Sequence, residues 1–219
     1  MSCRIPSCHG RTSPYGRYCN AHKIRHRRHG DPLQETITQA TLKTSLKLLR
    51  DCIKKNSDKA LWPKLEERWA ETLASCRDYI AEAQAGAIFN RHRVKASFEL
   101  LKLDGVVAPR DVVEAVLAVY LLQEQEPRRF KSDRAFLFQL ARRVRSLSEM
   151  NAGVYYNHVT GRMKRVYRDL KPTATEALGG ILVESFGAAA LYIARLVTHG
   201  REQQAQAKQQ IVAALQEIA

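Results

Sequence analysis

The chain has 219 residues, a hydrophobic fraction of 45% and a formal charge of +14. This length and composition allow one or two domains with a buried core and exclude a wholly disordered chain. The charge lies in two windows, because residues 1–31 carry seven Lys or Arg against one acid and residues 128–171 carry twelve against three. Local basicity of this kind is typical of chains that bind a polyanion, so nucleic acid is the first partner to consider, with a merely solvated surface as the alternative.

The first 22 residues contain four candidate metal ligands with the spacing C-x4-C-x10-C-x2-H: Cys3, Cys8, Cys19 and His22. Zn²⁺ in small modules takes four tetrahedral thiolate and imidazole ligands, and such modules fold around the metal. The i, i+3 spacing of Cys19 and His22 places both on one side of a helix that runs toward His29, which favours His22 over its competitor His9. The sequence therefore predicts a treble-clef-like zinc finger over residues 1–32, with unmetallated thiols in a flexible tail as the alternative.

The same stretch, followed by the run RHRRHGDP, resembles the short zinc module at the N-terminus of many phage and mobile-element proteins, often HNH-type homing endonucleases. The resemblance covers about 32 of the 219 residues, and no family is recognised in residues 33–219. It implies that the finger helix presents four basic side chains to a DNA backbone or groove: Lys23, Arg25, Arg27 and Arg28. Beyond the finger, the sequence departs from those endonucleases, because no second His follows His158 at the distance that an HNH site needs.

Three amphipathic helices are expected in residues 33–105, after Gly30-Asp31-Pro32 ends the finger helix and begins a linker. Apolar side chains recur at helical spacing in three stretches: residues 36–55, 63–86 and 88–103. Cys52 and Cys76 fall among these apolar positions and are expected in the core rather than on a metal. Because the five cysteines form no disulfide framework and no signal sequence is evident, the chain is expected to be cytoplasmic.

Residues 106–171 combine helices with a basic hairpin. The second helix of this segment, at 132–148, carries arginines on its outer face: Arg142, Arg143 and Arg145. The arms Val154–Val159 and Met163–Arg168 predict a β-hairpin joined through Thr160-Gly161. Its cations are Arg162, Lys164, Arg165 and Arg168. This order is that of a winged helix-turn-helix whose helix at 132–148 enters the major groove, and a helical domain with a surface hairpin is the equal alternative.

Residues 172–219 are expected to form two or three further helices, beginning at Pro172. The stretch Ala177–Val197 is long and apolar, but Glu184 near its middle favours a buried helix and no membrane contact. The last helix could close the core or pair with a second copy in a homodimer through one apolar face: Ile211, Leu215 and Ile218. The expected fold is thus mainly α, with a small zinc finger at 1–32 followed by a helical domain that carries a hairpin.

The expected function is that of a zinc-containing DNA-binding protein of a phage or mobile element. Such a regulator or accessory factor would contact duplex DNA at two ends of the molecule, through the finger helix and through the 132–168 helix and hairpin. The alternatives are a DNA nuclease or recombinase that uses His158 and Tyr167, or an RNA- or protein-binding adaptor. Common nucleotide-binding and hydrolase motifs are absent, and few exposed aromatic residues are expected beside the cations, which argues against stacking on single strands.

Overall fold

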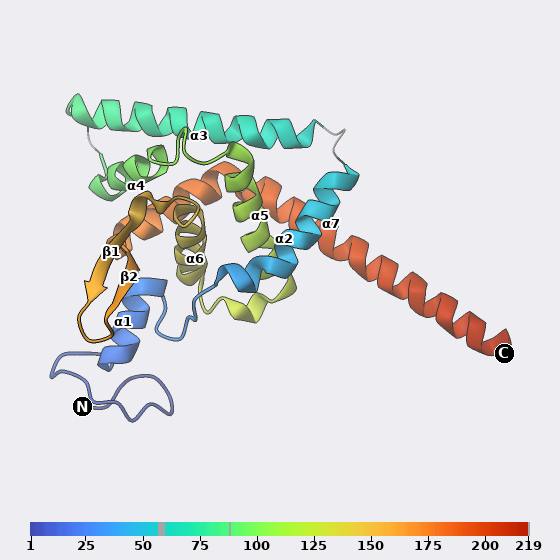
Figure 1. The fold of residues 1–219 in the computed structure, drawn as a ribbon, viewed down its shortest axis with the longest axis horizontal. Coiled ribbons are helices and arrows are strands. Elements are labelled where there is room, and N and C mark those ends of the chain that lie inside the picture. Colours follow the sequence, from blue (N-terminus) through green and yellow to red (C-terminus); the bar gives the residue numbers. More distant parts are fainter. Residues whose placement is uncertain (57–59, 88, 219) are drawn as a thin grey trace.

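The computed structural model describes residues 1–56, 60–87 and 89–218, with side chains except at 165, 167, 204, 205, 207, 208 and 211–218. The described residues confirm the mainly α fold with one hairpin (Figure 1). The elements are α1 (Asn20–His29), α2 (Gln39–Lys55), α3 (Leu61–Gln84), α4 (Arg91–Leu101), α5 (Pro109–Gln125), α6 (Asp133–Arg145), β1 (Ala152–Asn157), β2 (Arg162–Tyr167) and α7 (Pro172–Ile218). Short 3₁₀ turns at Pro127–Arg129 and Glu149–Asn151 flank α6.

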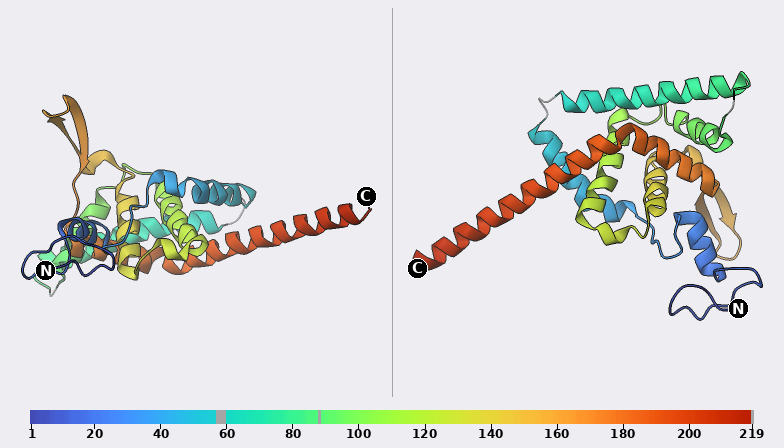
Figure 2. Two further views of the ribbon diagram at one scale, coloured as in Figure 1. Left: turned by 90° about the horizontal axis from the view of Figure 1, so that it is seen from below. Right: turned by 180° about the vertical axis from the view of Figure 1, so that it is seen from behind.

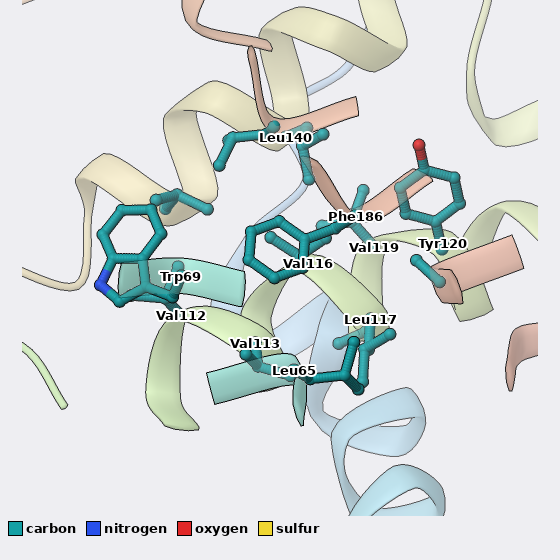
Figure 3. Packing of buried hydrophobic residues seen from close by; sticks show 14 of the residues in the cluster. Leu65, Trp69, Val112, Val113, Val116, Leu117, Val119, Tyr120, Leu140 and Phe186 are labelled. Carbon is teal, nitrogen blue, oxygen red and sulfur yellow. The ribbon is translucent and has the colours of Figure 1, made fainter. Parts of the chain in front are cut away.

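Helix α5 forms the centre of the hydrophobic core. Eleven consecutive residues, from Val112 to Leu122, are buried, because neighbouring helices cover α5 on every side. Figure 3 shows side chains from four helices meeting there: Val116, Trp69, Leu140 and Phe186. One cluster runs from Ile37 to Ala194, so all three sequence segments behind the finger contribute to a single core.

The prediction of two or three helices after residue 172 is wrong, because α7 is continuous over 47 residues. Two of its glycines, Gly179 and Gly187, serve helix packing, and none of its four glycines ends the helix. A Cβ on Gly179 would lie 2.5 Å from the Leu137 carbonyl oxygen, and one on Gly187 would lie 3.0 Å from the Tyr120 hydroxyl. Glycine therefore lets α7 approach α5 and α6 closely, which sequence periodicity alone does not reveal.

The first part of α7, Pro172–Gln203, is long and apolar enough by length and composition to cross a membrane. In the structure this part belongs to the protein core, where Leu178, Leu182 and Phe186 are fully buried. The end of α7 extends away from the other helices (Figures 1 and 2). Ile211, Leu215 and Ile218 lie outside the described side chains, so the homodimer stays a prediction.

Strands β1 and β2 form an antiparallel hairpin that projects from the helical body (Figure 2). The register pairs Ala152 with Tyr167 and Asn157 with Arg162. The predicted hairpin and its Gly161 turn are confirmed, with Gly161 at φ 63°. The first arm ends earlier than predicted, at Asn157, because the Asn157 carboxamide oxygen accepts hydrogen bonds from the backbone N–H groups of the turn and caps it.

Helix α6 is unsuited to the role of a recognition helix, which corrects the winged helix-turn-helix interpretation. Only Asp133 of α6 is exposed, and its other residues are buried or half-buried beneath α1, α5 and α7. Three arginines of this helix pair with acids from other segments: Arg134 with Glu176 at 2.9 Å, Arg142 with Asp169 at 2.8 Å and Arg145 with Glu99 at 3.0 Å. A helix enclosed in this way cannot enter a major groove.

Candidate metal centre and basic surface

The finger brings its four predicted ligands together without a hydrophobic core. A bridge between Ser2 and Arg11 closes the loop that carries Cys3 and Cys8. Cys19 is the N-cap of α1, so the first turn of that helix carries His22 back to the same point. The four ligand atoms all lie within 4.8 Å of one another, and His9 is exposed outside the group. The structure therefore places a candidate metal site where the spacing predicted it.

The distances between these atoms fit one tetrahedral ion. Cys8 Sγ lies 3.9 Å from Cys19 Sγ, and His22 Nδ1 lies 3.5 Å from Cys3 Sγ and 3.3 Å from Cys19 Sγ. Ligands at the usual zinc bond lengths stand about 3.8 Å apart for two sulfurs and about 3.6 Å apart for sulfur and nitrogen. Three thiolates and one imidazole can therefore hold a metal ion here with little rearrangement.

The surroundings of Cys3 favour its thiolate form, which is the form that binds metal. Burial raises the pKa of the Cys3 thiol, but the backbone N–H groups of Cys19 and Ile5 and the side chains of His22 and Cys8 outweigh it and lower the pKa to about 6. The Cys19 N–H group donates to Cys3 Sγ at 3.4 Å. The fold thus supplies hydrogen-bond donors for a sulfur that carries negative charge.

The finger is fixed to the helical body by buried polar contacts. The expected linker after Gly30 is a packed segment, with Gln34 and Ile37 buried. The Gln139 side chain of α6 accepts from the Ile37 N–H at 3.0 Å and donates to His29 Nδ1 at 3.2 Å. Gly30 has φ 82°, and a Cβ there would meet the Arg134 carbonyl oxygen at 2.9 Å. The sequence did not predict this docking, because a buried Gln–His pair leaves no periodic pattern in it.

Helix α1 carries its histidines on one face and several exposed cations around it. His22, His26 and His29 share the face toward the ligands and α6. Lys23, Arg25 and Arg27 are exposed, with Arg25 one turn before His29 at the edge of the histidine face, and among the described residues none of these three has an ion-pair partner. The predicted basic face of the finger helix is therefore open to solvent.

The two basic windows of the sequence meet at one place, which corrects the expectation that they lie at two ends of the molecule. Asp169, just after the hairpin, binds Arg28 of α1 at 3.2 Å and Arg142 of α6 at 2.8 Å. A pocket of about 190 Å³ lies between these elements and the start of α7. Its charged lining consists of five cations and one acid: Arg27, Arg28, Arg142, Arg145, Lys171 and Asp169. We call this pocket, together with Lys23 and Arg25, the junction surface.

A second pocket adjoins the first across the Arg142–Asp169 ion pair. It is lined by residues from the start of α2, by the end of α6 and by Asn151. The Asn151 side chain is buried, and its Nδ2 has no hydrogen-bond partner among the described residues. Because this nitrogen has almost no accessible surface, it is an unsatisfied buried donor and not a contact that the pocket offers to a ligand.

The remaining predicted cations fall into three groups. Arg145 is withdrawn from solvent, since its side chain is 11% exposed and pairs at 3.0 Å with Glu99, which corrects its placement on an open face. Arg143 donates to the Ser146 hydroxyl at 2.8 Å. On the hairpin, Arg162, Lys164 and Arg168 are exposed, whereas the Arg165 side chain lies outside the described residues.

The structure gives no catalytic partner to His158 in the described part of the chain. Its ring is exposed at the hairpin turn, with its centroid 5.1 Å from that of Tyr156, and the Tyr167 side chain lies outside the description. Among the described residues, the finger ligands are the one set of His, Cys, Asp or Glu close enough to share a metal. Comparisons with family models, curated proteins and solved structures find no match to this chain.

Proposed function

We propose that this chain is a zinc-containing protein that binds duplex DNA through the junction surface. The observation that carries the proposal is the convergence of the two basic windows on one pocket, which is lined by five cations and the single carboxylate of Asp169. Four of these cations, Arg27, Arg28, Arg142 and Lys171, are at least partly exposed, whereas Arg145 pairs with Glu99. A duplex presents a phosphate charge about every 1.7 Å along its axis, so it can engage many of these cations at once.

In this proposal the metal is structural. Three Cys and one His form a closed tetrahedral set that leaves no position for a reacting water, and this set suits Zn²⁺. The ion would hold the start of α1 so that Lys23, Arg25 and Arg27 stay exposed beside the pocket. The resemblance of the finger to modules of phage and mobile-element proteins supports a role as a regulator or accessory factor of such an element.

Rigid attachment of the finger favours binding. His29, Gln139 and Gly30 fix α1 against α6, so its cations are positioned before DNA arrives. Preorganised contacts lose less conformational entropy on binding than contacts from a tethered module. The junction surface is therefore proposed to act as one site and not as two sites joined by a linker.

A charge-removal experiment tests the proposal. The variant Lys23→Gln/Arg25→Gln/Arg27→Gln should lower affinity for a labelled duplex at least about tenfold and reduce the salt slope of log affinity by about 3, one per lost phosphate contact. The matched control, Lys54→Gln/Lys55→Gln/Lys64→Gln, removes three exposed cations near the junction of α2 and α3, away from the finger (Figure 1). Equal losses in both variants would show that only net charge matters and would refute a specific surface.

A further inference from the structure

The hairpin exposes an unusual amount of apolar surface for a two-stranded ribbon. Six large apolar side chains on it are at least 42% exposed: Val154, Tyr155, Tyr156, Val159, Met163 and Val166. Figure 2 shows that the ribbon stands away from the helices, so no neighbouring element covers either of its faces. An isolated hairpin is only marginally stable in water, and exposed apolar clusters mark interaction sites.

The aromatic rings of the hairpin lie on both faces and beside cations. Tyr155 and Tyr156 are 47% and 49% exposed, and neighbouring strand positions point to opposite faces. Lys164 is the cross-strand partner of Tyr155, so both share one face. On the other face, His158 contacts the Tyr156 ring edge-on, at an interplanar angle of 80°. This overturns the expectation that few exposed aromatic residues accompany the basic ones.

We propose that the hairpin binds unpaired DNA bases by stacking them on Tyr155 and Tyr156. From residue 150 to residue 168 the chain contains no Asp or Glu, which makes the ribbon complementary to a polyanion. A second copy of the same ribbon would bring like charges together, which disfavours that occupant. Stacking on aromatic rings needs bases whose faces are accessible, as in single strands and not within a duplex.

The position of the hairpin beside the junction surface indicates which DNA structure would be bound. Its base is tied to the junction surface, because Arg145 donates to the Arg168 carbonyl oxygen at 3.1 Å and Asp169 binds Arg28. A duplex on the junction surface would place the hairpin next to that duplex. The inference rests on the proposed function and extends it to DNA in which a duplex adjoins an unpaired segment, such as a fork.

The test compares two labelled DNAs with the metal-loaded full chain: a duplex of about 20 base pairs, and the same duplex with two unpaired arms of about 10 nucleotides, a length within single-strand site sizes. Wild type should bind the fork about tenfold more tightly. The single variants Tyr155→Ala and Tyr156→Ala should each lose the preference for the fork, and their affinity for the duplex should be unchanged. Tyr155→Phe should keep the preference for the fork because the aromatic ring remains.

The control is Tyr192→Ala on α7, which removes an even more accessible ring, 62% exposed, away from the hairpin. This variant should bind both the fork and the duplex with the affinity of the wild type. Equal wild-type binding to fork and duplex would overturn the inference but leave the proposed function intact, whereas absence of binding to either DNA would overturn both. A dimer of the free protein that Tyr155→Ala converts to a monomer in light scattering would assign the ribbon to a second copy instead.

Discussion

The interior of the finger consists of cysteine and histidine side chains, whereas the helical body buries a cluster of 33 residues that the structure describes. The body is stabilised by removal of apolar surface from water, which needs no ligand. The finger has too few apolar side chains for that, and in our proposal it depends on metal coordination by its four clustered ligands. The proposed DNA surface lies where the two meet, so one half of the site depends on metal and the other half does not.

Removal of the metal should separate the two regions most clearly. Cys19→Ser should lose about one equivalent of zinc and lower duplex affinity at least about tenfold, because the cations of α1 lose their fixed positions. Far-UV circular dichroism should fall only slightly, since α1 is ten residues long. Unchanged zinc content by elemental analysis would contradict the assignment of the metal site, and Cys52→Ser is the matched control outside it.

Two adjacent glycines of α7 test the packing of the body. Gly179→Ala should lower the free energy of unfolding by about 1–3 kcal/mol, because the added Cβ meets the Leu137 backbone. Gly180→Ala should raise it by about 0.5–1 kcal/mol, because that position is open and alanine favours the helix. Urea unfolding measures both, and equal effects would contradict the close approach of α7 and α6. Zinc content should be the same in both variants.

The attachment between the regions should weaken at low pH. Burial lowers the pKa of His29 to about 4, with Arg142 adding to the effect and Asp169 opposing it. The unfolded chain therefore takes up a proton below about pH 6.5 that the folded protein excludes, so stability is lost as pH falls toward 4. Because solvent partly screens the His29 ring, the free energy of unfolding should fall by about 1 kcal/mol between about pH 7.5 and about pH 5.5.

His29→Gln provides the control for this effect, because both proteins keep the same zinc ligands and the difference between them isolates His29. Urea unfolding at the two pH values should show a smaller loss in the variant. An equal loss in both proteins would mean that His29 is not buried in its neutral form. Burial of the ring is the main reason that the neutral form is preferred, and the Gln139 amide, which donates to Nδ1, is compatible with that form.

The smallest expected effect concerns the acid at the centre of the junction surface. Asp169 binds Arg28 and Arg142 where a phosphate would bind, so Asp169→Asn should raise duplex affinity about two- to fivefold. Glu67→Gln, which removes an exposed acid on α3, should leave affinity nearly unchanged. Lower affinity in Asp169→Asn would show that this carboxylate positions the arginines rather than competing with DNA.

The extent to which the sequence predicts the structure differs between the same two regions. The four candidate ligands of the finger were predictable, because small zinc modules mostly use Cys and His at short spacings and the spacing of Cys19 and His22 fixes their face. Helix periodicity also predicted α2 to α6 and the hairpin. Periodicity could not reveal that Gly179 permits close packing within a continuous helix, because glycine also commonly marks the end of a helix.

Long-range polar pairs account for the remaining differences. Arg145 resembles an exposed cation in the sequence, and only the fold brings Glu99 from α4 to it. In the same way, nothing local indicates that Asp169 joins α1 to α6 and thereby brings two basic windows together. Such pairs join residues far apart in the chain, and the local pattern of a single sequence contains no signal for them.

The most direct test of the central claim is the salt dependence of duplex binding by the metal-loaded full chain. With about six phosphate contacts on the junction surface, log affinity should fall linearly with log salt concentration at a slope of about −5. The slope for the chelator-treated protein should be shallower by about 3, since the cations of α1 are no longer held in place. A slope near zero, or the same slope with and without metal, would contradict the account.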